Sequence, residues 1–94
     1  MKVPVIELAI SIRQPYVEQI LLGVKPYEYR NRLTHVRGRV YLYAAKTLVD
    51  SAAERRKARS KPEELPTGVI VGSVEITGCK PWRGGGFRYK LENP

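Results

Sequence analysis

Residues 23–30 read Gly-Val-Lys-Pro-Tyr-Glu-Tyr-Arg, and this stretch marks a change from helix to strand. Just before and within it, apolar residues recur at the i, i+3, i+4, i+7 spacing of one helical face: Val17, Ile20, Leu21 and Val24. Gly23 is placed to end that helix, because a left-handed cap costs glycine nothing. After Pro26 the residues alternate, so Glu28 and Arg30 share one face of a strand and two tyrosines take the other. The stretch predicts a short helix followed by a strand that carries a carboxylate and a guanidinium side by side.

Four other segments alternate between apolar and polar residues, as half-buried strands do. They cover residues 5–12, 39–45, 69–77 and 87–92. Within the third, Gly72 marks a bulge or a close approach of another element. The Ala-, Arg- and Lys-rich segment 51–60 is expected to form an exposed helix, because its apolar face is thin. The connectors are residues 31–38, 61–67 and the glycine turn 84–86. About five strands and two helices, without a repeat, predict an α+β fold: a small mixed barrel with helices at its side or mouth.

The chain is strongly basic. Its 94 residues contain 17 Lys and Arg against 9 Asp and Glu, a formal net charge of +8 with a pI near 9.9. The length suits a single domain over residues 1–94 with one modest core. On so small a body this charge favours polyanions, nucleic acid first and anionic membrane surfaces second. The alternative is that the charge serves only solubility.

Several classes of protein are disfavoured by what the sequence lacks. No stretch approaches the roughly 20 apolar residues that span a bilayer, and the first residues, with Glu7 in a strand-like run, do not resemble a secretory signal. Cys79 is the only cysteine, so no internal disulfide can form, and the single histidine, His35, leaves little for a metal site. We therefore expect a cytoplasmic protein without membrane attachment, metal or cofactor.

The stretch 23–30 resembles the signature of the ASCH family, Gly-x-Lys-x-x-Glu-x-Arg, with its fixed positions filled by Gly23, Lys25, Glu28 and Arg30. Four other stretches are also similar to the family: Ser-Ile-Arg-Gln-Pro-Tyr at 11–16, Arg-Gly-Arg at 37–39, Gly-Ser-Val-Glu-Ile at 72–76 and Leu-Glu-Asn-Pro at 91–94. The resemblance spans nearly the whole chain and implies a PUA-like barrel with a cleft lined by the signature beside the first helix. Two departures are a shortened region between 77 and 86 and Tyr89 in place of a usual Trp.

ASCH members are generally regarded as RNA-interacting, so the resemblance implies an RNA-binding domain with a basic cleft. Lys25 and Arg30 would meet phosphate or a base edge, and carboxylates would orient them or accept from an exocyclic amine. Basic groups interleaved with tyrosines suit single-stranded RNA or a modified nucleoside, because phosphates meet cations while bases stack on rings. The candidate RNA-binding residues are Lys25, Tyr27, Arg30, Arg32, Arg37 and Arg39.

Some ASCH members are hydrolases of RNA or modified nucleosides, and the candidate catalytic residues are Lys25, Glu28 and Glu75, the last placed near the signature by family analogy. A carboxylate would take a proton from water while Lys25 and Arg30 stabilise negative charge. A metal-independent ribonuclease is the first alternative. An amidohydrolase of acylated nucleosides is the second, because Glu28 stands where related acetylcytidine amidohydrolases have Thr and adds a charge beside Lys25. A divalent metal on the two glutamates would need more oxygen ligands than we can name.

Plainer interpretations are open for the same residues. Glu28 and Arg30 can pair with neighbours across a sheet, and Gly23 can be a helix cap without further role. Trp82 is either a core residue or a stacking platform. If its own side chains fill the cleft, a protein-interaction domain becomes the better hypothesis. The sequence leaves the RNA sequence preference and the oligomeric state open.

Overall fold

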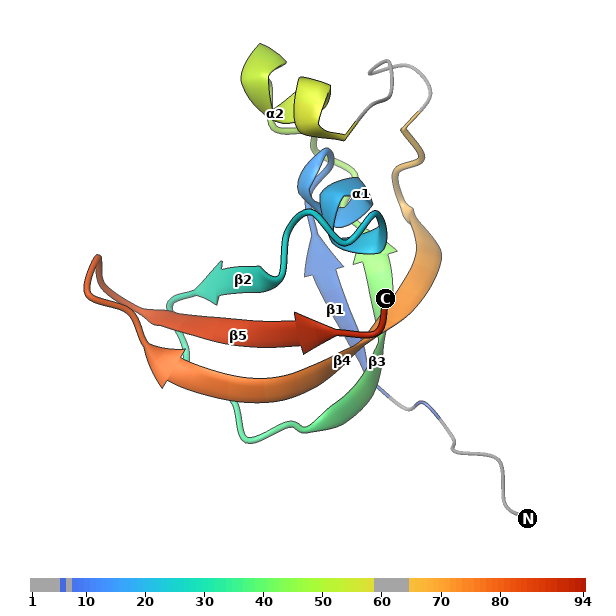
Figure 1. Cartoon of the computed structure of the whole chain (residues 1–94). Helices are drawn as coiled ribbons and strands as arrows, with labels where there is room; N and C mark the ends of the chain where they lie inside the picture. The colour runs from blue at the N-terminus through green and yellow to red at the C-terminus, as the bar shows by residue number, and fades with distance from the viewer. Residues whose placement is uncertain (1–5, 7, 59–64) are drawn as a thin grey trace.

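The computed structural model describes residues 6, 8–58 and 65–94 (Figure 1). Within them the chain forms five strands and two six-residue helices. In chain order these are β1 (Ala9–Ile12), α1 (Tyr16–Leu21), β2 (Tyr27–Arg30), β3 (Gly38–Ala44), α2 (Ala52–Lys57), β4 (Val69–Pro81) and β5 (Phe87–Glu92). The α+β class is therefore confirmed.

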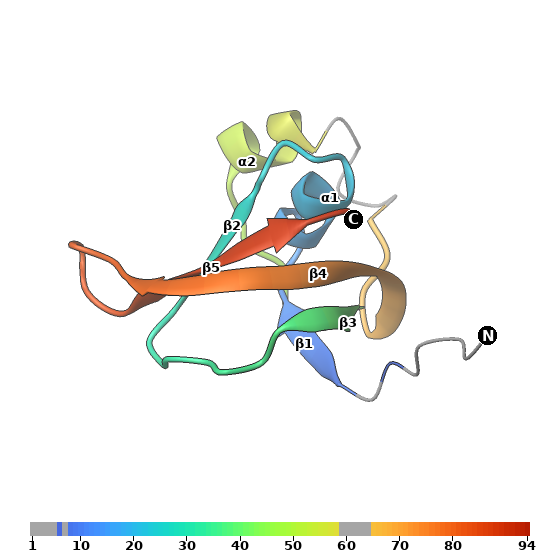
Figure 2. The same cartoon turned by 60° about the horizontal axis from the view of Figure 1, so that its bottom comes forward.

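All five strands belong to one sheet in the order β1-β3-β4-β5-β2. The pair β1–β3 is parallel and the other neighbouring pairs are antiparallel. Pairing along the 13-residue β4 is irregular at two points, opposite Leu42/Tyr43 and at Ile76/Gly78, and such bulges bend a strand. The sheet curls into a half-barrel, which agrees with the predicted small PUA-like barrel (Figures 1 and 2).

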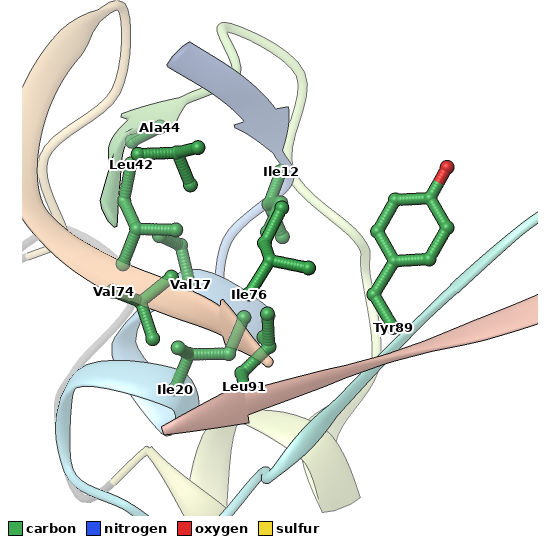
Figure 3. Close-up of a cluster of buried hydrophobic side chains, with 10 residues drawn as sticks. Ile12, Val17, Ile20, Leu42, Ala44, Val74, Ile76, Tyr89 and Leu91 are labelled. Carbon is green, nitrogen blue, oxygen red and sulfur yellow. The ribbon is translucent and has the colours of Figure 1, made fainter. Parts of the chain in front are cut away.

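The core lies on the concave side of this sheet, where α1 covers it (Figure 3). Val17 and Ile20 of α1 are 0% and 1% exposed. The core cluster consists of Ile12, Val17, Ile20, Val40, Leu42, Ala44, Val74, Ile76, Tyr89 and Leu91. Full burial of one large apolar side chain stabilises a fold by about 1.5–3 kcal/mol. The apolar face of α1 therefore holds the helix in place, and with it the start of the signature.

Two buried glutamines connect the helices to the rest of the domain. Gln14 donates from Nε2 to the carbonyl of Pro66 at 3.0 Å and accepts the N–H of Glu18 at 3.1 Å. Gln19 donates from Nε2 to the carbonyl and to Oε2 of Glu54, at 2.9 Å in each case. Because Glu54 belongs to α2, Gln19 fixes α2 against α1. No residue of α2 is buried, as predicted for an exposed helix.

The first half of the chain differs from prediction in its element ends. Gly23 has φ +79°, as predicted for the residue that closes the helix. The helix ends at Leu21, however, so Val24, predicted to continue the apolar stripe, is 48% exposed. The first strand begins at Ala9, and residues 6 and 8 lie before it. The predicted strand begins at residue 5, and residues 5 and 7 lie outside the described residues.

In the second half of the chain, the observed elements agree more closely with the predicted ones. The helix covers 52–57 within the predicted 51–60, and residues 59–60, with 61–64 of the predicted connector, lie outside the described residues. The strand β4 extends to Pro81 rather than to residue 77. At Gly72 the predicted close approach is present, because a Cβ there would lie 2.6 Å from Cδ2 of Leu21. Across the described residues, no helix has the length and apolar character needed to cross a membrane.

Candidate nucleic-acid interface

Lys25 is positioned by the end of α1. Its backbone N–H donates to the carbonyl of Gln19 at 3.2 Å, which fixes the chain immediately after the helix. Its Nζ then lies 5.1 Å from the ring centre of Tyr16 and 5.0 Å from that of Tyr29. Both distances fall within the about 6 Å over which a cation is attracted to an aromatic ring. Lys25 is therefore a half-buried cation held at the edge of β2.

Glu28 is the buried acid of this region. It pairs in register with Tyr89 of β5, so it faces the concave side, and it is 8% exposed. Its Oε1 accepts the backbone N–H of Tyr29 at 3.1 Å, and its Oε2 lies 3.6 Å from Nη1 of Arg30. Burial raises the pKa of the Glu28 carboxyl above its ordinary value, although Lys25, the Tyr29 N–H and Arg30 each oppose the shift. This carboxyl takes up a proton more readily than an exposed glutamate does.

A hollow of about 420 Å³ opens beside Glu28 and Arg30. It is lined by Ser11, Ile12, Arg13, Tyr16, Glu28, Arg30, Ala45 and Val49. Its volume lies within the range of about 300–1,000 Å³ that is usual for small-molecule sites. Arg30 crosses from β2 to β1 at this point, since its Nη1 donates to the carbonyl of Ser11 at 2.9 Å. Two signature side chains therefore meet at one hollow, with Lys25 at its margin, against the ring of Tyr16.

Glu75 does not lie in this hollow, and the expectation that it neighbours the signature is wrong. It pairs in register with Arg39 on one side and Glu92 on the other, while the flanking Val74 and Ile76 are buried. Because side chains alternate along a strand, Glu75 faces the convex side, opposite to Glu28. The catalytic set of Lys25, Glu28 and Glu75 is therefore not assembled.

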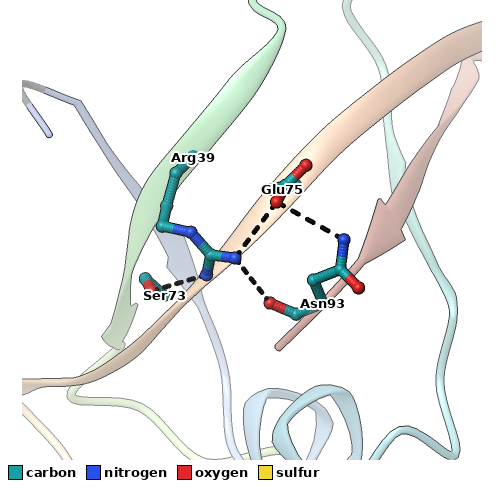
Figure 4. A network of polar contacts seen from close by, with 4 residues as sticks. All are labelled: Arg39, Ser73, Glu75 and Asn93. Atoms are coloured by element: carbon teal, nitrogen blue, oxygen red, sulfur yellow. Dashed lines mark hydrogen bonds and ion pairs between the residues drawn. The ribbon is translucent and has the colours of Figure 1, made fainter. Parts of the chain in front are cut away.

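On the convex side, Glu75 belongs to a network around Arg39 (Figure 4). Nη2 of Arg39 donates to Oε1 of Glu75 at 3.2 Å and to the carbonyl of Asn93 at 2.9 Å, and Nη1 donates to Oγ of Ser73 at 2.9 Å. Asn93 also donates from Nδ2 to Glu75 at 3.4 Å. Arg39 is a candidate RNA-binding residue, but its guanidinium connects β3, β4 and the residues after β5 by hydrogen bonds.

The loop between β2 and β3 carries two other candidate residues, Arg32 and Arg37, and both are exposed. Its backbone is held by Tyr89, whose hydroxyl donates to the carbonyl of Arg32 at 2.8 Å. Nη1 of Arg37 donates to the carbonyls of Thr34 and Val36, at 3.1 and 2.8 Å. The guanidinium of Arg37 is therefore partly engaged by the backbone of its own loop.

Tyr27 lies on the other side of β2 from Glu28, with the guanidinium carbon of Arg88 4.5 Å from its ring centre. It therefore does not line the hollow. Three lining residues, Ser11, Arg13 and Tyr16, were missed as site residues. Their position could have indicated a site, because they lie where the first predicted strand ends and the first predicted helix begins. Among the described residues, no three His, Cys, Asp or Glu side chains gather in a group that could hold a metal ion.

A curled five-stranded sheet with a helix on its concave side, and a Lys, Glu and Arg group where α1 meets β2, defines a small PUA-like domain. The family model of the ASCH domain matches residues 10–89. Because the match covers most of the chain, including the whole signature, the chain belongs to the ASCH domain family. Comparison with curated proteins finds no match.

Proposed function

We propose that this ASCH domain binds RNA at the hollow between β1, α1 and β2. The observation that carries the proposal is the buried Glu28 held beside two cations at a hollow of about 420 Å³. In this site Arg30 meets a phosphate or a base edge, and the ring of Tyr16 offers a stacking surface. Glu28 is the acceptor for an exocyclic amine, because its carboxylate lines the same wall.

The charge of the domain supports the same function. The net charge of +8 creates a positive potential around a small body, and Arg32 and Arg37 stand exposed on the loop that follows β2. We assign phosphate contacts to these two side chains. Arg39 receives a structural role instead, because its guanidinium already donates to Ser73, Glu75 and Asn93.

The test is an anisotropy titration of labelled single-stranded RNA of mixed sequence between roughly 50 and 200 mM salt. Released counterions make the wild-type affinity fall steeply with salt. Arg30→Gln should weaken binding by about tenfold or more, as expected for loss of a hydrogen bond to a charged group. Arg56→Gln, which removes the same charge from the exposed face of α2, should change it little. Absent or salt-insensitive binding, or equal losses in the two variants, would refute the proposal.

A second candidate function, hydrolysis, is favoured by one observation, the raised pKa of the buried Glu28 carboxyl. Burial raises the pKa of this carboxyl beside a hollow that admits a ligand, which suits a general acid or base. Lys25, whose Nζ lies 5.1 and 5.0 Å from the ring centres of Tyr16 and Tyr29, then stabilises developing negative charge. The substrates are RNA, in a metal-independent ribonuclease, or less favourably an acylated nucleoside.

Cleavage is tested with labelled mixed RNA and with acetylated cytidine, with and without EDTA. Activity that resists EDTA and is lost in Glu28→Gln supports the hydrolase. A Glu28→Gln protein that cleaves as well as wild type refutes it. RNA binding without cleavage of either substrate leaves the binding function alone.

A further inference from the structure

The convex face of β2, β5 and β4 carries a row of stacked side chains, which we call the outer ladder: Tyr27, Arg88, Trp82 and Tyr29. The guanidinium carbon of Arg88 lies 4.5 Å from the ring centre of Tyr27 and 5.1 Å from that of Trp82. The rings of Trp82 and Tyr29 are 5.4 Å apart between centres and inclined by 58°. The row thus holds one planar cation between two aromatic rings, with a third ring beyond them.

Strand register explains why these residues share a face. Tyr29 pairs with Arg88, and Arg88 pairs with Lys80 on the other side. The residues between them, Glu28 and Tyr89, point to the concave side and are buried. Trp82 follows β4 directly, and its backbone N–H donates to the carbonyl of Gly86 at 2.9 Å across the turn. The outer ladder therefore lies on the side of the sheet opposite Glu28, and only the ring of Tyr29 reaches the margin of the hollow, where Nζ of Lys25 lies 5.0 Å from its centre.

The chemistry of this face matches a single nucleic-acid strand. Tyr29 and Trp82 are 46% and 37% exposed, so both have ring surface available. A second hollow, of about 280 Å³, adjoins the row and is lined by Tyr27, Thr77, Gly78, Cys79, Lys80, Arg88 and Lys90. Of its three cations, only Lys90 has an acidic partner within the described residues, Glu92 at 3.6 Å. Exposed rings beside unpaired cations are the combination that stacks bases and holds phosphates.

We propose that the outer ladder is a second RNA-binding surface, which stacks the bases of a single strand independently of the hollow at Glu28. Arg88 is already sandwiched between Tyr27 and Trp82, so the open ring surfaces of Trp82 and Tyr29 are where bases stack. Lys80 and Arg88 take the phosphates. The inference does not rest on the proposed function, because its ligand needs no residue of the first hollow.

Trp82 is the only tryptophan of the chain, so its fluorescence reports this surface directly. We expect octauridylate to quench Trp82, and an abasic oligonucleotide of equal length, which keeps the phosphates, to bind about tenfold more weakly or worse. Polyglutamate serves as the polyanion without bases. Quenching of equal strength by the abasic strand or by polyglutamate would overturn base stacking, as would binding of octauridylate without any change in Trp82.

Variants separate this surface from the first hollow. In the anisotropy assay, Trp82→Leu and Arg88→Gln should each weaken RNA binding by about fivefold or more. The control Tyr41→Leu removes a tyrosine that is 40% exposed on β3, outside the ladder, and should leave affinity unchanged. If Arg30→Gln has no effect while the ladder variants weaken binding, the proposed function fails and this inference stands. If folded ladder variants bind like wild type, this inference fails whatever Arg30→Gln does.

Discussion

Replacement of Gly86 by alanine tests how closely the β4–β5 turn approaches the signature strand. A Cβ at Gly86 would lie 2.6 Å from the carbonyl oxygen of Arg30 and 3.3 Å from Cα of Asn31. Both contacts are with backbone atoms, which cannot rotate away as a side chain does. Gly85 is the matched control, because its φ is also positive but no described atom lies within 4 Å of its Cβ position.

We expect Gly86→Ala to lower the free energy of unfolding more than Gly85→Ala does. Backbone strain alone would give the opposite order. A left-handed conformation costs an alanine about 1–2 kcal/mol. Gly85 has φ +100° and Gly86 has φ +72°, and the left-handed minimum lies near +57°. Strain alone would therefore make Gly85→Ala the more destabilising. The forced contact adds about 1–3 kcal/mol at Gly86, so we expect losses of about 3 kcal/mol for Gly86→Ala against about 1–2 kcal/mol for Gly85→Ala.

Urea unfolding followed by far-ultraviolet circular dichroism measures both free energies without relying on Trp82, which lies beside the turn. Similar m-values in the variants would show that the change lies in stability. Gly86→Ala should also weaken RNA binding, because the contact displaces the strand that carries Arg30. Equal losses, or a larger loss for Gly85→Ala, would show that β2 moves away from the turn freely and would refute the reasoning.

Three further predictions concern the acid, the core and a helix cap. Because burial raises the pKa of Glu28 above its ordinary 4.5, the stability that its protonation contributes is present below that value and is lost as pH rises through the folded-state pKa. The free energy of unfolding of Glu28→Gln minus that of wild type should therefore increase from pH 4.5 upward and then level off, whereas a constant difference would contradict the raised pKa. Leu42 is fully buried and Leu48 is 43% exposed, so Leu42→Ala should destabilise by about 2–5 kcal/mol and Leu48→Ala by far less in urea unfolding; similar losses would contradict the assigned core. Ser51 accepts the N–H of Glu54 at 3.3 Å as the cap of α2, so Ser51→Ala should weaken the helix by about 1 kcal/mol. Faster amide exchange in α2 would confirm the cap, and unchanged exchange would exclude it.

Much of this fold follows from local pattern. Alternation over 39–45 and 87–92 predicts β3 and β5, because the face of each residue is set by its immediate neighbours. The same reasoning places Glu28 and Arg30 on one side of β2, and both line the hollow at the end of that strand. The helix cap at Gly23 is predicted from the backbone freedom of glycine. These features need no knowledge of which strand lies opposite.

The strand that contains Glu75 shows what the local pattern does not predict. Alternation across 69–77 assigns Val69, Val71 and Glu75 to one face, but the pairing with β3 passes from Gly72 directly to Ile70 and skips Val71. Val71 consequently packs against the core, whereas Val69 is 47% exposed. A bulge and a register depend on the partner strand, which the pattern of one segment does not specify. The bulge changes the face of Val71 and leaves the alternation around Glu75 intact. Family analogy places Glu75 near the signature, whereas its separation from Glu28 follows from the strand order, in which β5 lies between β4 and β2.

The hydrogen bond from Arg30 to the carbonyl of Ser11 has a consequence for the size of ligand that the domain can accept. At this point the two edge strands are joined by a side chain rather than by a backbone ladder. To rotate away, the guanidinium gives up one hydrogen bond, about 1.5–3 kcal/mol for a charged donor, and its ion pair with Glu28 at 3.6 Å, whereas separating paired strands would break several backbone hydrogen bonds. A third hollow, of about 240 Å³, lies along the same junction and also has Arg30 in its lining. Arg30 is the one described residue that lines both hollows, so movement of its side chain would change the space available in both while the backbone pairing of the sheet stays intact.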